Sequence, residues 1–113
     1  MKKLFCLALA LTLAMAFCMT AMAEETDGVA AIQAAGVLKV GVKADVEGFG
    51  YQDLDGTYSG LEIDLAHEMA AIILGDADAV EFTAVTAKTR GPLLDTGELD
   101  MVIATFTIKA DRI

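Results

Sequence analysis

Residues 60–73 constrain the fold more than any other part of the chain. A glycine is followed by two acids that alternate with apolar residues, and apolar residues then recur at the three- and four-residue spacing of an amphipathic helix. This apolar stripe consists of Ile63, Ala66, Met69, Ala70 and Ile73. Gly75 follows as a natural helix C-terminus. The pattern predicts a turn that leads into a helix over 61–74, with one face packed on a core.

Helical and extended patterns alternate along the rest of the chain. The predicted helices are 26–35, 61–74 and 89–96, and the predicted strands are 37–42, 80–85 and 101–105. Residues 43–50 are predicted to form a loop, and 53–56 a hairpin-like turn in which Gly56 can take a positive φ. Strands separated by helices imply right-handed crossovers, and so an α/β fold with a mainly parallel sheet and flanking helices.

The N-terminus has the three parts of a secretory signal peptide. Met1-Lys2-Lys3 is basic, residues 4–19 are almost wholly apolar, and Ala21-Met22-Ala23 is a small-x-small cleavage site. We expect residues 1–23 to be removed after Ala23, which places the mature chain in the periplasm or outside the cell. A membrane anchor is the less favoured alternative, because the apolar run is at the short end for spanning a bilayer.

Both cysteines, Cys6 and Cys18, lie within the predicted signal peptide. Cys18 is preceded by Phe17, where a lipoprotein cleavage motif has a small residue, so we do not expect a lipoprotein. The mature chain is therefore predicted to contain neither a disulfide nor a reactive thiol.

The remaining 24–113 can form one small domain at most. The net charge of −9 becomes more negative when Lys2 and Lys3 are removed. An acidic surface argues against nucleic acid and anionic membrane as partners. It also makes a basic residue next to a strand end more informative, because ligands of parallel sheets bind beyond the carboxyl ends of the strands. Three segments meet that criterion, and they start at Lys43, Thr86 and Thr105.

Catalytic and metal-binding motifs are absent from the sequence. There is no Ser-His-Asp set, phosphate-binding glycine loop or zinc-ligand spacing. His67, between Asp64 and Glu68, is expected to be solvated, and turn chemistry explains Asp53 and Asp55. We therefore expect a protein that is not an enzyme and that has no metal or cofactor.

Residues 60–73 resemble the signature of the bacterial extracellular solute-binding proteins of the polar amino-acid family, which are periplasmic receptors of ABC importers. Three further blocks, 40–46, 85–90 and 99–112, resemble the family in the same order. The resemblance covers nearly all of 36–113. It implies the first lobe of a periplasmic-binding-protein-like fold, and capture of an amino acid that is delivered to a membrane permease.

The resemblance also implies roles for residues of the last block. Arg112 corresponds to the arginine that clamps the ligand α-carboxylate, and Thr105 and Thr107 to positions that add hydroxyl and backbone N–H donors. A guanidinium fork matches a carboxylate in two parallel hydrogen bonds, which a lysine does not reproduce. From the residues alone, Arg112 can equally be a solvated surface arginine.

Lys43 and Arg90 suggest the ligand class. In the members that look most similar, both would face the ligand side chain, and two cations beside Arg112 suit glutamate or aspartate. The alternatives are a solvated Lys43 and an Arg90 paired with Asp95 or Glu98. Phe49 is either an apolar wall against the ligand or a core residue.

Members of this family are considerably longer and have two lobes. The chain stops at Ile113, so we expect an N-terminal part of lobe 1, spanning 24–113, that acts as a monomer. The favoured function is capture of a dicarboxylic amino acid for an ABC importer. The alternatives are a glutamine or cystine receptor, a dehydratase-type enzyme or a sensor module on the same fold.

Overall fold

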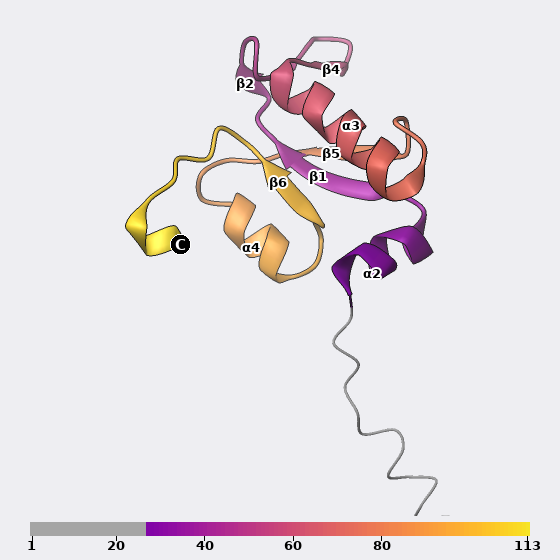
Figure 1. Ribbon diagram of the computed structural model, residues 1–113. Helices are drawn as coiled ribbons and strands as arrows, with labels where there is room; N and C mark the ends of the chain where they lie inside the picture. The colour runs from indigo at the N-terminus through magenta and orange to yellow at the C-terminus, as the bar shows by residue number, and fades with distance from the viewer. Residues whose placement is uncertain (1–26) are drawn as a thin grey trace, which may run out of the picture.

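The computed structural model describes residues 27–113 (Figure 1). The predicted signal peptide and its cleavage site lie outside the described residues. Three parallel strands form the main sheet in the order β5-β1-β6, with β1 at Leu38–Val42, β5 at Val80–Ala84 and β6 at Met101–Ile103. The predicted α/β architecture with a parallel sheet is therefore confirmed.

Three α-helices connect these strands or precede them: α2 (Gly28–Ala35), α3 (Leu61–Leu74) and α4 (Arg90–Asp95). The bounds of α3 are those that the apolar stripe predicts. The Asp27 carboxylate accepts a hydrogen bond from the Val29 N–H and caps α2, and Gly75 ends α3 with φ 73°. Within 27–113 no helix has the length and apolarity needed to cross a bilayer.

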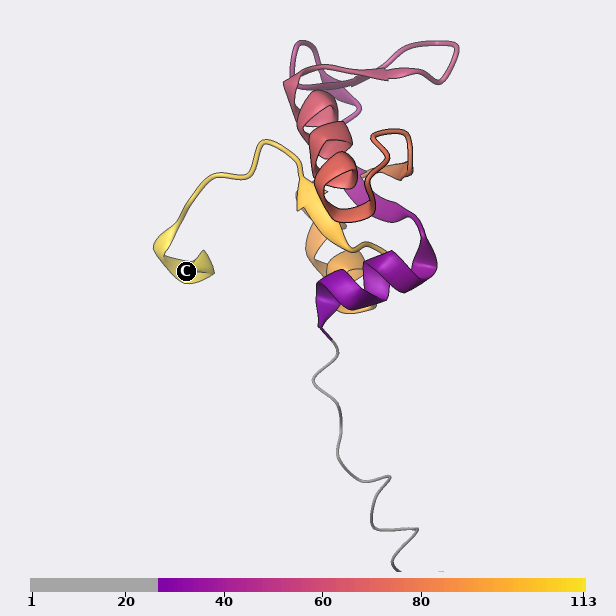
Figure 2. The same cartoon turned by 45° about the vertical axis from the view of Figure 1, so that its right-hand side comes forward.

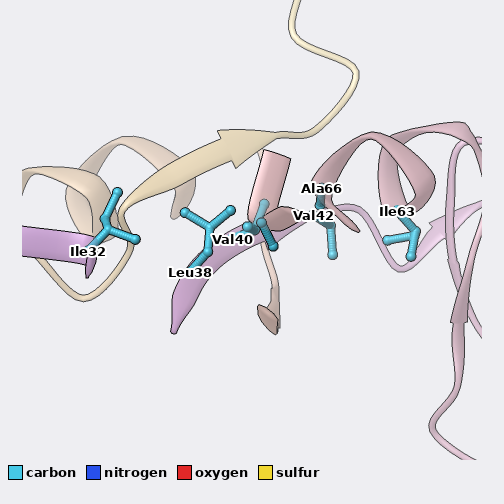
Figure 3. Packing of buried hydrophobic residues seen from close by; sticks show 7 residues of the cluster. Ile32, Leu38, Val40, Val42, Ile63 and Ala66 are labelled. Carbon is cyan, nitrogen blue, oxygen red and sulfur yellow. The ribbon is translucent and has the colours of Figure 1, made fainter. Parts of the chain in front are cut away.

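The main core lies between β1 and α3 (Figure 3). Alternate residues of β1 point to this side, and they are the largest fully buried side chains: Leu38, Val40 and Val42. They pack against residues of α2 and α3, namely Ile32, Ile63, Ala66 and Ala70. The predicted helix stripe is thus confirmed, with Met69 and Ile73 partly buried at its edge.

The opposite face of β1 packs against a second, smaller cluster, which consists of Val85, Leu99 and Ala104. Gly41 lies in β1 on this face, and a Cβ added there would lie 2.7 Å from Leu99 Cδ1. A side chain at position 41 would therefore overlap the second cluster. This close approach packs Leu99, which precedes β6, against the centre of the sheet.

Residues 43–50 are not a simple loop, contrary to the sequence prediction. β2 (Asp45–Val46), β3 (Gly50–Gln52) and β4 (Tyr58–Ser59) form a second, antiparallel sheet. Strands of two or three residues are too short to show a two-residue alternation, so the sequence pattern cannot reveal them. The turn between β3 and β4 projects from the rest of the described structure (Figure 2), and Gly56 has the predicted positive φ, 88°.

The strand predictions at the carboxyl ends were slightly too long. β6 ends at Ile103 rather than at residue 105, because Thr105 has a φ of 44°, which is incompatible with an extended strand. After β6 the chain leaves the sheet as an extended segment that ends in a short 3₁₀ helix, Ala110–Arg112 (Figures 1 and 2). The helix predicted over 26–35 begins at Gly28, and the remaining predicted strand and helix bounds differ from the observed ones by at most one residue.

Candidate ligand-binding site

Arg90 begins α4 and is almost fully buried, with 9% of its surface exposed. Its Nη1 donates a hydrogen bond of 3.0 Å to the carbonyl oxygen of Ala104, just after β6. The sequence-based alternative, a pair with Asp95 or Glu98, is wrong, because the side chain reaches across to the residue that follows β6. Arg90 therefore joins two of the three segments that follow the strand ends.

Phe106 brings the two arginines of the site together. The guanidinium carbon of Arg90 lies 3.8 Å from the centre of the Phe106 ring, and that of Arg112 lies 4.6 Å from it. Both distances are within the range of cation–π attraction. Arg112 Nη1 also donates to the carbonyl oxygen of Thr107, at 3.0 Å.

Neither guanidinium forms a salt bridge with a carboxylate of residues 27–113. Each donates through one Nη1 to a backbone carbonyl oxygen, of Ala104 or of Thr107. A guanidinium has five N–H donors, so most of the hydrogen-bonding capacity of Arg90 and Arg112 remains. The pair can therefore bind a carboxylate.

Thr105 and Thr107 are exposed and belong to the same segment as Phe106 and Arg112. Thr105 is the one non-glycine residue with a positive φ in the described part of the chain. A β-branched residue in this conformation is strained, so other contacts must hold it. The predicted threonines and Arg112 thus lie on one segment at the carboxyl end of β6, and its strained backbone position is Thr105.

Lys43 and Phe49 form a second group, at the end of β1 and next to β3. Lys43 Nζ forms a salt bridge of 3.1 Å with Asp45, and the Lys43 side chain is only 18% exposed. Phe49 is 47% exposed, so the alternative that it is a core residue is wrong. Its ring is available to contact a ligand.

Glu62, which the sequence does not predict as a site residue, links the two groups. It is 7% exposed, and its Oε1 accepts a hydrogen bond from the backbone N–H of Thr105. Its own N–H donates to the carbonyl oxygen of Phe49, at 3.0 Å. The sequence signal that could have identified it is an acid between two apolar residues in the first turn of a helix.

Gly60 permits this arrangement. It has φ 119°, and a Cβ added there would overlap the backbone of Phe49. The first N–H groups of α3 bind the preceding loop instead of a side-chain cap, since Leu61 N–H donates to the Gly48 carbonyl oxygen at 3.0 Å. The loop that carries Phe49 is therefore attached directly to the start of α3.

The residues excluded as metal ligands show ordinary structural contacts. His67 is predicted to be solvated, but it makes two contacts within the fold. Its Nδ1 lies 2.6 Å from the Ala77 carbonyl oxygen, and its ring packs against that of Phe82 in a T-shaped arrangement. Asp55 accepts a hydrogen bond from the Thr57 N–H in the β3–β4 turn. Across 27–113 there is no group of three potential metal ligands.

Comparison with known proteins places this geometry in a family. The bacterial extracellular solute-binding proteins, family 3, match residues 38–113. The chain is 44% identical over 82 residues to a glutamine-binding protein of Geobacillus stearothermophilus, covering 72% of the chain and 31% of the relative. It is 39% identical over 90 residues to the ABC transporter glutamine-binding protein GlnH of Bacillus subtilis, covering 79% and 33%.

Solved structures agree in fold. A solute receptor for L-cysteine of Neisseria gonorrhoeae superposes with a TM-score of 0.71 and 37% identity, over 74% of the chain and 34% of the receptor. Domain 1 of the arginine-binding protein TmArgBP, in a Phe57Trp mutant, gives a TM-score of 0.67 at 31% identity, over 74% and 63%.

The chain spans about a third of the length of the curated relatives, 31% and 33% in the two glutamine-binding proteins. The match to the family nevertheless extends from the first residue of β1 to the last residue of the chain and includes every candidate ligand-binding residue. The resemblance noted in the sequence is confirmed. The chain belongs to family 3 of the bacterial extracellular solute-binding proteins.

Proposed function

We propose that the protein is the receptor of an ABC importer and captures a polar amino acid, with Arg112 binding the ligand carboxylate. The observation that carries this proposal is the pair of guanidiniums, Arg90 and Arg112, held on Phe106 without a carboxylate partner among the described residues. Thr105 and Thr107 add polar groups on the same exposed segment. These groups lie beyond the carboxyl ends of parallel strands, where ligands of such sheets bind.

The names of relatives support an amino-acid ligand. They include glutamine-binding proteins, glutamate-binding proteins of two Corynebacterium species and the general L-amino acid-binding periplasmic protein AapJ of Rhizobium johnstonii. Most relatives are solute-binding proteins, which favours a receptor over an enzyme. One structural neighbour is described as an amino acid-binding precursor of cyclohexadienyl dehydratase, so a dehydratase is the alternative to be tested.

Glutamate or aspartate is the favoured ligand, because Lys43, Arg90 and Arg112 supply three cations for two carboxylates. A buried carboxylate without a partner is strongly unfavourable, so a site for a dicarboxylic amino acid needs such cations. Glutamine is the second candidate. The 3.1 Å pair of Lys43 with Asp45 partly neutralises Lys43 and so favours an uncharged amide at that position.

Titration calorimetry of the full-length protein with glutamate, aspartate, glutamine and cystine tests the ligand class. We expect Arg112→Lys to weaken every amino acid that binds, by about tenfold or more, because lysine keeps the positive charge but cannot form the two parallel hydrogen bonds of a guanidinium with a carboxylate. Lys43→Ala should weaken glutamate and leave glutamine nearly unchanged. Lys39→Ala is the matched control, since Lys39 lies near the opposite end of the same strand.

Three outcomes would contradict this assignment. If Lys43→Ala binds glutamate as tightly as the parent does, the hypothesis of a dicarboxylic ligand is excluded and glutamine becomes the favoured ligand. Failure of every amino acid to bind, together with turnover of a carboxylic acid substrate, would indicate the dehydratase alternative. Equal losses in Lys39→Ala and Lys43→Ala would show a general charge effect.

The proposed setting is the periplasm, with a membrane permease as partner, a monomeric receptor and no nucleic acid. The family description as extracellular and the periplasmic name of AapJ support this location. The intact mass of the native protein should correspond to a chain that starts at Glu24. A neighbour described as the arginine-bound form of domain 1 supports ligand binding by a first lobe alone. Light scattering on the purified protein tests the monomer.

A further inference from the structure

Glu62 is a buried carboxylate at a junction of three segments. One oxygen accepts the Thr105 N–H, and the other, Oε2, is buried without a hydrogen-bond partner among the described residues. The first turn of a helix favours negative charge there, since the helix dipole is positive at this end. Even so, burying a carboxylate that has one oxygen without a hydrogen bond lowers the stability of a small fold.

The strained residue next to it gives a reason to keep it. Thr105 has φ 44°, and nothing in its own β-branched side chain favours that conformation. A charge-assisted hydrogen bond from its N–H to Glu62 is stronger than a neutral one and stabilises the unusual backbone. The turn it makes directs Phe106, Thr107 and the following residues away from β6.

The backbone of Glu62 holds a second segment. Its N–H donates to the Phe49 carbonyl oxygen, at 3.0 Å. A Cβ added at Gly50 would lie 3.0 Å from Glu62 Oε2, so the absence of a side chain at position 50 leaves room for the carboxylate. One residue of α3 therefore fixes both the Phe49 loop and the Thr105 turn.

We propose that Glu62 is a positioning residue of the ligand site. It does not contact the ligand, but it holds the Thr105 backbone in the conformation that presents Thr105, Thr107 and the Phe106–arginine group. This inference rests on the proposed function for its effect on affinity. The hydrogen bond between Glu62 and the Thr105 N–H can be tested without any ligand.

The experiment compares Glu62→Ala, Glu62→Gln and Asp64→Asn in the full-length protein. Asp64 is the matched control, because it is the next acid of the same helix and is exposed. Nuclear magnetic resonance of the ligand-free protein measures the chemical shift and hydrogen exchange of the Thr105 amide. Calorimetry with glutamate and glutamine measures affinity, at protein stabilities verified by urea unfolding.

We expect the Thr105 amide to shift and to exchange faster in Glu62→Ala, and to change much less in Glu62→Gln, whose amide oxygen can still accept the hydrogen bond. Affinity should fall by about tenfold or more in Glu62→Ala and by about threefold in Glu62→Gln. Asp64→Asn should change neither. If the Glu62→Gln variant keeps most of the affinity that Glu62→Ala loses, the effect comes from the hydrogen bond to Thr105 and not from a general loss of packing.

Three results would overturn the inference. The first is an unchanged Thr105 amide in Glu62→Ala. The second is a folded Glu62→Ala protein with the affinity of the parent. The third applies if Glu62→Ala does not fold: it is a folded Glu62→Gln protein in which the Thr105 amide exchanges as fast as it does in the urea-denatured protein. If the parent binds no amino acid, the proposed function fails, while the Thr105 amide still decides the role of Glu62.

Discussion

The core beneath α3 and the segment from Ala104 to Arg112 are held in opposite ways. Leu38, Val40 and Val42 are completely buried and are fixed by close packing. The segment after β6 is exposed from Thr105 onward and is fixed by a few directional contacts: the hydrogen bond from Thr105 to Glu62, that from Arg112 to Thr107, and the stacking of two guanidiniums on Phe106.

This difference indicates how stability and the proposed ligand binding are divided between the core and the exposed segment. Burial is nondirectional and contributes free energy in proportion to the apolar area removed from water, so the β1–α3 core stabilises the fold. Directional contacts on an exposed segment contribute less to stability, but they determine where charged groups point. Mutations on the two sides should therefore affect different measurements.

The largest effect is expected for Leu38→Ala. Removing a fully buried leucine side chain in β1 leaves a cavity against α3, and we expect the free energy of unfolding to fall by about 2–5 kcal/mol. Urea unfolding followed by circular dichroism measures this loss. Ile72→Ala is the control, because Ile72 lies on α3, the helix that covers the core, but is 76% exposed. This substitution should change the free energy of unfolding by less than about 0.5 kcal/mol.

Equal destabilisation by Leu38→Ala and Ile72→Ala would contradict the division. It would mean that the outer surface of α3 is covered by another part of the protein. In a protein that remains folded, Leu38→Ala should leave the relative affinities for glutamate and glutamine unchanged, since Leu38 lies at the start of β1, away from the strand ends.

Phe106→Leu is expected to have a smaller effect of the opposite kind, on ligand affinity rather than on the free energy of unfolding. The ring is 49% exposed, so its removal should change stability little, but both arginines lose a cation–π contact of about 0.5–1 kcal/mol each. We expect amino-acid affinity to fall by about threefold to tenfold in calorimetry. Ile108→Ala is the control on the same segment, since Ile108 is 86% exposed. Affinity that falls equally in the two variants would show that the ring has no special role.

Phe106→Trp sharpens the same comparison. The 113 residues contain no tryptophan, so the new indole is their one tryptophan and can be excited at wavelengths where the two tyrosines absorb little. Tryptophan is also the best aromatic partner of a guanidinium, and affinity should therefore be retained. Its emission should change when a ligand carboxylate draws Arg112 from the ring, and an emission insensitive to saturating ligand would place the carboxylate elsewhere.

The part of the fold that could be predicted is the part fixed by packing. The apolar stripe of α3 and the runs of β1 and β5 give a clear periodicity, and the structure has these elements within about one residue of the predicted bounds. β2 could not be predicted, because two residues show no period. The candidate residues Arg90 and Arg112 could be named from the sequence, and their functional roles stay predictions.

What could not be predicted depends on contacts between residues far apart in the chain. The early end of β6 follows from the conformation of Thr105, which is held by Glu62, 43 residues away. The sequence offers Asp95 and Glu98 as the alternative partners of Arg90, whereas the carbonyl oxygen that its side chain binds belongs to Ala104, 14 residues away. Local patterns carry information about propensity and burial, whereas such distant hydrogen bonds emerge only when the elements have packed.

The smallest expected effect concerns the β3–β4 turn, which is exposed and held by directional contacts like the segment after β6. The backbone N–H of Thr57 binds the Asp55 carboxylate, at 2.9 Å, and this hydrogen bond, with a lesser one from the Thr57 hydroxyl, lowers the pKa of Asp55. Because the folded pKa is lowered, the contribution to stability is complete above the unfolded pKa, about 3.9. It is lost as the pH falls through the lower, folded value.

Thr57→Val removes the hydroxyl and keeps the N–H, so the pKa of Asp55 should rise part of the way toward its ordinary value. Titration of the Asp55 carboxyl resonance between about pH 2 and pH 6 measures this change. Thr83→Val in β5 is the control and should leave the titration of Asp55 unaltered. A pKa of Asp55 that equals its ordinary value in the parent would mean that the turn is not closed in solution. Hydrogen bonds within an exposed turn would then be too weak to hold its conformation. The conformation of the exposed segment 105–112 would accordingly rest mainly on its contacts with two buried side chains, Glu62 and Arg90.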